Sequence, residues 1–124
     1  MKGRILVTFI VSLSLGAAFG SRVALAHAIV VEATPAANAI IGTPTVPIDL
    51  KFNSRIEATR SRLAVVDTTG KSQVLELKPN SPPNHMQAIV TNLAPGKYRL
   101  EWYVLSADGH ITRGNLKFLV QATP

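Results

Sequence analysis

The 124-residue sequence contains no cysteine. A chain without thiols forms no disulfide bonds, offers a metal ion no thiolate and carries out no thiol redox chemistry. If so small a domain is exported, its apolar core alone must stabilise it. Any metal ion that it binds must be held by nitrogen and oxygen ligands.

Long runs of basic residues are also missing, although the formal net charge is +6. Three basic residues fall within the first 26 positions, so residues 27–124 carry ten basic and seven acidic side chains, a net charge of +3. The ten are scattered along the chain and form no basic run. This pattern disfavours binding to a phosphate backbone, and we expect no nucleic-acid partner.

The first 26 residues have the features of a cleaved export signal. Two basic residues precede an apolar run over 5–19, and Ala24-Leu25-Ala26 is a small-x-small cleavage site. The apolar run is too short to favour a membrane span. The pattern predicts a signal peptide over 1–26 and a mature secreted domain over 27–124, which would begin at His27.

Apolar and polar residues alternate with a period of two along the rest of the chain, as they do in strands with one buried face. No window has the apolar stripe of a helix. Pro95-Gly96 shortly before Tyr98 resembles the tyrosine corner of immunoglobulin-like folds. We predict an all-β domain, an immunoglobulin-like antiparallel β-sandwich or Greek-key barrel. About seven strands are expected, near residues 29–31, 48–52, 63–66, 74–77, 88–90, 98–104 and 116–120.

Cleavage would give His27 a free α-amine. Free α-amines have pKa values of about 7.7 to 8.0, low enough for the proton to be lost to a metal ion near neutral pH. The amine nitrogen and imidazole Nδ1 would close a six-membered chelate ring, and such a nitrogen pair suits copper(II) best. The alternative is that His27 is merely the residue that follows the cleavage site.

A second candidate lies in Ser106-Ala107-Asp108-Gly109-His110, directly after the longest predicted strand. Asp108 and His110 are two residues apart, so an extended backbone would project both side chains to the same side, and Gly109 allows a close turn. A carboxylate and an imidazole could then converge. The alternative is an ordinary Asp-Gly hairpin turn followed by an exposed histidine. Ser106 either orients this loop or is a simple turn residue.

Together these residues offer three nitrogens and one oxygen, a complete equatorial set for copper(II). At this point the sequence resembles the CopC-type periplasmic copper-binding proteins. The resemblance extends over the whole mature chain, from His27-Ala28 through Leu93 to Tyr98 and on to residues 106–110. It implies an immunoglobulin-like fold, a role in copper tolerance or delivery, and copper(II) ligands at His27, Asp108 and His110. It also suggests an inner-membrane copper transporter as a partner.

Two positions depart from patterns found in that family. Some members have a glutamate near the copper, where this chain has Ser54, and the nearby Glu57 is in a different register. Some also have a methionine-rich loop for copper(I), whereas Met86 is the only methionine after residue 26. His85 beside Met86 could contact a soft metal, but we interpret the pair as an exposed loop histidine next to a core methionine.

We therefore predict a monomeric copper(II)-binding protein without enzymatic activity. One rival is a copper oxidase or monooxygenase, because an N-terminal histidine that chelates copper also serves oxygen chemistry in lytic polysaccharide monooxygenases. Against it, a 98-residue mature chain offers little surface for a polymer, and Asp108 would occupy a position that oxygen needs. The other rival is a metal-free secreted interaction module, for which the fold alone would suffice.

Overall fold

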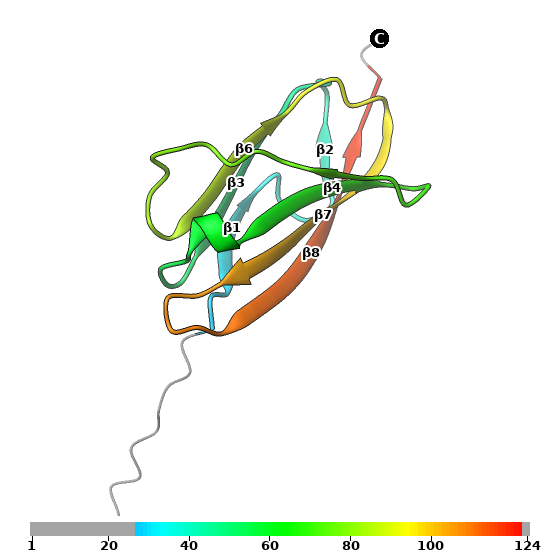
Figure 1. The fold of residues 1–124 in the computed structure, drawn as a ribbon. Helices are drawn as coiled ribbons and strands as arrows, with labels where there is room; N and C mark the ends of the chain where they lie inside the picture. The colour runs from blue at the N-terminus through cyan, green and yellow to red at the C-terminus, as the bar shows by residue number, and fades with distance from the viewer. Residues whose placement is uncertain (1–26, 123–124) are drawn as a thin grey trace, which may run out of the picture.

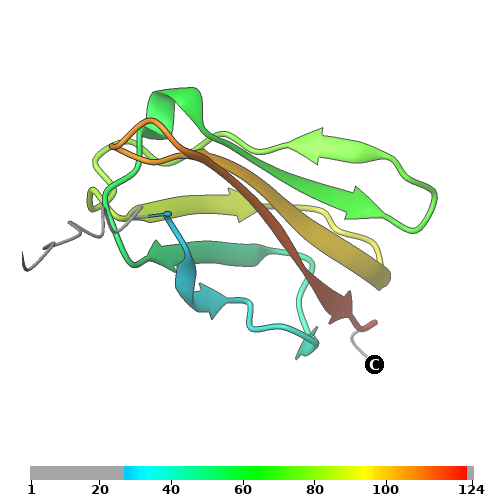
Figure 2. The same ribbon diagram turned by 90° about the horizontal axis from the view of Figure 1, so that it is seen from below.

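The computed structural model describes residues 27–122, which form a sandwich of two β-sheets (Figures 1 and 2). A three-stranded sheet has the order β1-β3-β6, and a five-stranded sheet has the order β2-β8-β7-β4-β5. The strands are β1 (Val30–Thr34), β2 (Ala39–Ile41), β3 (Val46–Phe52), β4 (Arg62–Asp67), β5 (Ser72–Val74), β6 (His85–Val90), β7 (Gly96–Leu105) and β8 (Ile111–Val120). One 3-10 turn, η1 (Ala58–Arg60), precedes β4.

The predicted all-β sandwich is confirmed, with eight strands among the described residues in place of about seven. All pairings are antiparallel except that of β2 with β8, which is parallel. No helix within residues 27–122 is long and apolar enough to cross a membrane. The predicted signal peptide, residues 1–26, lies outside the described residues.

The core lies between the two sheets and follows from the period-two alternation. On β3, Val46, Ile48, Leu50 and Phe52 are at most 2 % exposed, while the residues between them are not buried. The five-stranded sheet contributes inward-facing residues from β4, β7 and β8, of which Leu63, Leu100, Val104, Leu116, Phe118 and Val120 are buried. This apolar core is the stabilising element that a chain without cysteine requires.

The expected tyrosine corner is present. The Tyr98 hydroxyl donates a hydrogen bond to the carbonyl oxygen of Ala94, 2.5 Å away, and the Tyr98 ring stacks on Phe118 at 5.6 Å between centroids. The first contact fixes the turn before β7, and the second ties that end of β7 to β8. The two strands, each of ten residues, then form an antiparallel hairpin whose pairs run from Gly96↔Val120 to Leu105↔Ile111.

Several strands are longer than the runs that predicted them, such as β8, which begins at Ile111 and not near residue 116, and two further differences concern the short strands β5 and β2. The run near 74–77 predicted a strand, but β5 ends at Val74 because the chain then crosses between the sheets. The Leu75 N–H still bonds to Leu63 in β4, whereas the Lys78 N–H bonds to Gln87 in β6. The second difference is β2, which was not predicted; it has three residues and pairs only with β8.

Candidate metal site

The β7–β8 hairpin ends in the turn that contains the predicted Asp-Gly-His motif. Leu105 pairs with Ile111, and the five residues between them close the hairpin through Ser106 N–H to the His110 carbonyl, 2.8 Å, and Gly109 N–H to the Ser106 carbonyl, 2.9 Å. Gly109 has a φ of +89°, in the left-handed region that glycine adopts without strain. The hairpin interpretation is therefore correct, and the same turn holds Asp108 and His110 in place.

Ser106 fixes the Asp108 carboxylate. Its side chain is buried, and its Oγ lies close to Asp108 Oδ1 and 2.9 Å from the carbonyl oxygen of His110. A hydroxyl has one proton to donate, and the carboxylate is the closer and charged acceptor, so the hydrogen bond goes to Asp108. The structure thus supports an orienting role for Ser106.

Asp108 is held as an anion by these contacts. The Ser106 hydroxyl and then the His110 backbone N–H, 3.1 Å from Oδ1, lower the pKa of the Asp108 carboxyl to about 2. Hydrogen bonds donated to a carboxylate favour its charged form. Asp108 is therefore ionised throughout the neutral range and presents a negative oxygen beside the imidazole of His110.

His110 keeps one ring nitrogen inside the turn. Its Nδ1 lies 3.2 Å from Asp108 Oδ2, within ion-pair distance, but the geometry forms no hydrogen bond. Nδ1 is shielded from solvent and has no hydrogen-bond partner among the described residues, while 43 % of the His110 side chain is exposed. A buried polar atom without a partner costs free energy unless another group, such as a ligand, satisfies it.

The N-terminal segment is anchored so that His27 meets this turn. Ile29 exchanges two hydrogen bonds with Asn53: its N–H donates to Asn53 Oδ1 at 2.8 Å, and its carbonyl accepts from the Asn53 N–H at 2.9 Å. Ala28 is completely buried. The rings of His27 and His110 consequently lie 5.3 Å apart between centroids and are nearly perpendicular, at 81°. Figure 1 shows both segments at the same end of the sandwich.

The loop after β3 packs against the hairpin turn. The Arg55 carbonyl accepts from the Ala107 N–H at 3.2 Å, and the Glu57 N–H donates to the Leu105 carbonyl at 2.8 Å. The side chain of Glu57 is exposed, whereas Ser54 Oγ is buried without a hydrogen-bond partner. Residues 53–57 therefore support the turn mainly through their backbone.

Sequence reasoning missed two residues of this end of the sandwich. Asn53 anchors the N-terminal segment, and Thr112 Oγ1 is a further buried polar atom without a hydrogen-bond partner in the described chain. Thr112 lies two residues after His110 on β8, where an apolar residue would be expected to alternate into the core. That break in the apolar pattern was the available signal; Asn53 gave none.

Three side chains do not by themselves complete a metal site. Within residues 27–122, no group of three or more histidine, aspartate or glutamate side chains is close enough to hold a metal ion. The His27 ring lies near the His110 ring, and Asp108 lies near His110, but the three side chains together do not form a group close enough to hold a metal ion.

The interpretation of His85 as an exposed loop residue is wrong. His85 begins β6 and only 19 % of its side chain is exposed, because its Nδ1 lies 2.7 Å from Asp49 Oδ1. Gln87 donates to the other oxygen of Asp49 at 3.1 Å, so each carboxylate oxygen of Asp49 has a side-chain partner. Met86 is buried in the core, as expected. His85 and Asp49 satisfy each other across β3 and β6.

Comparison with known proteins places this geometry in a family. The sequence profile of the CopC domain matches residues 30–121. The chain belongs to the CopC domain family. The match covers every strand and the hairpin turn, and it begins just after His27.

Relatives support the assignment at the levels of sequence and fold. The chain is 33 % identical over 100 residues to protein YobA of Escherichia coli strain K12, a match that covers 77 % of this chain and 80 % of YobA. The crystal structure of CopC from Methylosinus trichosporium OB3b superposes with a TM-score of 0.71 at 28 % identity, covering 79 % of this chain and 97 % of that one. PcoC, a methionine-rich copper resistance protein from Escherichia coli, superposes with a TM-score of 0.62 at 25 % identity, covering 77 % and 100 %.

Proposed function

We propose that this CopC-family chain is exported to the periplasm and binds one copper(II) ion there. The ligands are the α-amine and Nδ1 of His27, the imidazole of His110 and a carboxylate oxygen of Asp108. One observation carries the proposal: the ring of His27 lies 5.3 Å from the ring of His110, which in turn contacts Asp108. Segments more than 80 residues apart in sequence thus bring two imidazoles and an anion to one end of the fold.

The donor that the side chains lack is the amine that cleavage after Ala26 creates. In the 124-residue chain the nitrogen of His27 is an amide and a poor ligand, whereas in the mature chain it is a primary amine that deprotonates readily. The described side chains alone form no group of three close enough to hold a metal ion, and the amine adds a further donor at the end of the sandwich where His27 meets His110. Copper binding would accordingly be acquired only on processing.

The donor set fits copper(II) better than other common divalent ions. Three nitrogens and one carboxylate oxygen suit a tetragonal ion, and copper(II) has the highest affinity in the first-row divalent series. The chain has no thiolate and its only methionine after residue 26 is in the core, so soft ligands for copper(I) are not available in the described residues. This distinguishes it from the methionine-rich PcoC.

Nδ1 of His110 and the carboxylate of Asp108 are suited to bind the same ion. Nδ1 has no hydrogen-bond partner among the described residues, and it lies 3.2 Å from Asp108 Oδ2, a separation that neighbouring ligands of one metal ion can have. An ion bound to Nε2, at the opposite edge of the ring, would lie out of reach of this carboxylate. We therefore take Nδ1 as the ligating nitrogen of His110.

Holding the ion, rather than turning over a substrate, follows from this ligand count. Four donors fill the equatorial plane of copper(II), which leaves no strong position for oxygen. Binding without catalysis fits a role in copper resistance, storage or delivery, with an inner-membrane copper transporter as donor or acceptor. Peroxide formation by the copper-loaded protein in the presence of a reductant would instead favour the oxidase alternative.

Titration of the processed chain with copper(II) tests the ligand set. We expect one copper per chain, and we expect His27→Ala and His110→Ala each to cost more affinity than Asp108→Asn. His85→Ala is the matched control, because His85 is paired with Asp49 within the three-stranded sheet, and its loss should leave copper binding unchanged. Equal affinity in wild type and His110→Ala would refute the site.

A further inference from the structure

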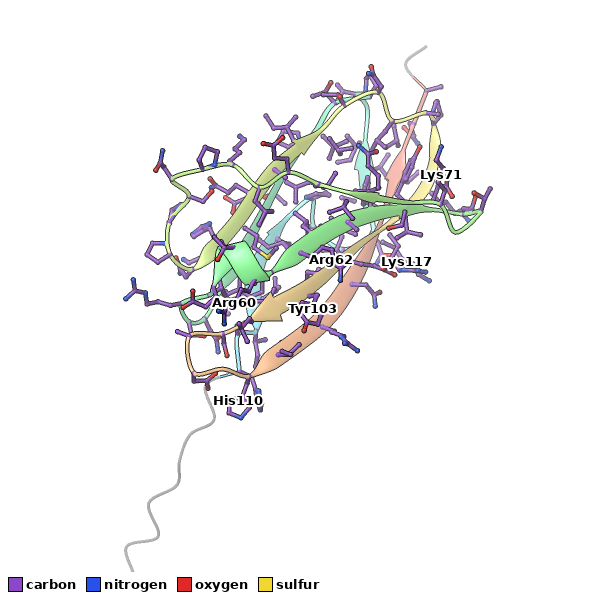
Figure 3. The ribbon with its side chains drawn as sticks, viewed as in Figure 1. Arg60, Arg62, Lys71, Tyr103, His110 and Lys117 are labelled. Carbon is purple, nitrogen blue, oxygen red and sulfur yellow. The ribbon has the colours of Figure 1, made fainter. Side chains whose placement is uncertain are left out.

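The outer face of the five-stranded sheet concentrates positive charge. Five basic side chains alternate outward along its strands: Arg62, Lys97, Arg99, Arg113 and Lys117, all exposed. Glu101 is the single acidic residue at an outward position of these strands. The face thus holds half of the ten basic residues of 27–124 but one of its seven acidic residues. Figure 3 shows Arg62, Tyr103 and Lys117 on this face and His110 at one end of it.

Most of this charge is not neutralised within the molecule. Glu101 is already paired with Arg99, with Oε1 2.6 Å from one guanidinium NH2 and 2.7 Å from Nε. In the part of the chain that the structure describes, the other four basic residues of the face make no ion pair. Asp67 lies at the far end of β4, but its carboxylate accepts hydrogen bonds from Thr69 and Lys71 in its own turn.

Two arginines flank a tyrosine at the end of the face nearest the candidate metal site. Tyr103 pairs across the sheet with Arg62 on β4 and with Arg113 on β8, and the Arg113 guanidinium lies 5.2 Å from the centre of the Tyr103 ring. These side chains line an open groove of about 490 Å³ that also reaches Val74, which is 60 % exposed. Arginine and tyrosine are the residues enriched in protein–protein interfaces.

We propose that this face, from the Arg62–Tyr103–Arg113 row to Lys117, is a docking surface for a partner protein that presents carboxylate side chains. Planar guanidinium groups bind carboxylates through two parallel hydrogen bonds. The guanidinium groups of Arg62 and Arg113, which make no ion pair among the described residues, could each bind a carboxylate of an acidic segment or patch on either side of Tyr103. The face runs from Tyr103 to Lys97 along β7, roughly 20 Å at about 3.3 Å per residue, which exceeds the length of a small anion. Its modest size fits a transient complex.

The β7–β8 hairpin connects this face to the candidate metal site. Tyr103 and Arg113 are each three residues from the turn residues Ser106 and His110. A partner seated on the row would therefore lie beside the end of the sandwich where His27 and His110 meet. Docking itself needs no copper, because none of the basic residues of the face belongs to the ligand set.

An acetylated hexaglutamate peptide is the probe, and amide chemical shifts of the processed chain at low ionic strength are the readout. We expect saturable shifts centred on Arg62, Tyr103 and Arg113. The affinity of the double variant Arg62→Gln/Arg113→Gln for the peptide should be at least about tenfold lower than that of wild type. The affinity of Lys71→Gln/Lys78→Gln, which removes the same charge elsewhere, should stay within about twofold of wild type. Arg62→Lys/Arg113→Lys should fall between, because it keeps the charge and loses the fork.

Three outcomes would overturn the proposal. Chemical-shift changes centred away from the face would show that the peptide binds elsewhere. An equal loss of affinity in Arg62→Gln/Arg113→Gln and in Lys71→Gln/Lys78→Gln would show that binding depends only on the net charge of the protein. Binding to phosphatidylglycerol vesicles that depends on Arg62 and Arg113, without binding to the peptide, would make the face a lipid-binding surface. The copper(II) affinity of Arg62→Gln/Arg113→Gln should match that of wild type. A negative result in the peptide experiment would therefore not bear on the proposed copper site.

Discussion

Ser106 determines how well the candidate metal site is arranged at the scale of single residues. Its buried hydroxyl is the main cause of the lowered pKa of Asp108 and fixes that carboxylate beside His110. Contacts of this kind orient a metal ligand without touching the metal, and their loss typically costs 10- to 100-fold in metal affinity.

We therefore predict that Ser106→Ala lowers the copper(II) affinity of the processed chain by roughly 10- to 100-fold while the chain still folds. Competition titration against a chelator measures this. Ser81→Ala is the control, because the Ser81 hydroxyl bonds only to the Lys78 carbonyl in an exposed loop. An unchanged affinity in folded Ser106→Ala would show that Asp108 needs no support or is not a ligand.

Asp67 provides a second prediction, on the turn between β4 and β5. The Thr69 hydroxyl, 2.6 Å from Asp67 Oδ1, is the largest cause of a lowered pKa for this carboxyl, and the backbone N–H groups of Lys71 and Thr69 add to it. A carboxyl whose pKa is lower in the folded state stabilises the fold above its unfolded pKa, and that contribution is lost as the pH falls through the folded value.

Asp67→Asn should therefore melt a few degrees below wild type at neutral pH, and the gap should narrow as the pH falls through the lowered pKa of wild-type Asp67. Thermal melts followed by circular dichroism over a series of acidic pH values measure the gap. A difference that does not change with pH would mean that the ionised carboxylate contributes nothing specific to the turn.

At the scale of elements, the hairpin of β7 and β8 depends on a glycine opposite the only tryptophan. Trp102 pairs with Gly114, and a Cβ on Gly114 would lie 2.4 Å from the indole ring. The indole thus occupies the space that any other residue would need. Gly114 has no positive φ, so close packing, not backbone conformation, requires glycine here.

Gly114→Ala should destabilise the fold by about 1–3 kcal/mol through overpacking and shift the fluorescence of Trp102. Urea unfolding followed by that fluorescence measures the change. Gly114→Ala/Trp102→Leu, compared with Trp102→Leu alone by circular dichroism, should show a smaller penalty because the clash is gone. A penalty of the same size in both backgrounds would mean that the indole is not the obstacle.

The elements that could be predicted from the sequence are those with long alternation. β3 and β7 were expected because a single pattern repeats over most of their seven and ten residues, and the second half of β8 because Leu116, Phe118 and Val120 alternate. The first half of β8 was not predicted, and β2 has only three residues and depends on its pairing with β8. The end of β5 was misplaced because the chain changes sheets after Val74, a tertiary event that leaves no local pattern. His85 was misplaced because its partner Asp49 is 36 residues away.

For the site, the motif at residues 106–110 and His27 could be found from residue type alone, but their meeting could not. It depends on Asn53, which ties Ile29 to the end of β3 and so sets the distance from His27 to His110. The unpartnered atoms of Ser54, His110 and Thr112 also appear only in three dimensions. Sequence reasoning supplied the candidate ligands, and the fold supplies their arrangement.

At the scale of the whole molecule, the proposed metal site depends on where the mature chain begins. Both sheets and the core cluster of the described residues are formed by residues 28–120. We therefore expect processing to leave this fold unchanged while it converts one amide nitrogen into a metal ligand. A residue added before His27 should then weaken copper(II) binding without changing the stability of the fold.

Electron paramagnetic resonance of the copper-loaded chain tests this claim most directly, comparing a chain that starts at His27 with one that carries a single extra alanine before it. We predict one tetragonal signal with several nitrogen ligands at one copper per chain, lost or replaced by a weaker species in the extended chain, while both chains melt at the same temperature without copper. An identical signal and affinity in the extended chain would contradict the account, because the α-amine of His27 could not then be a ligand.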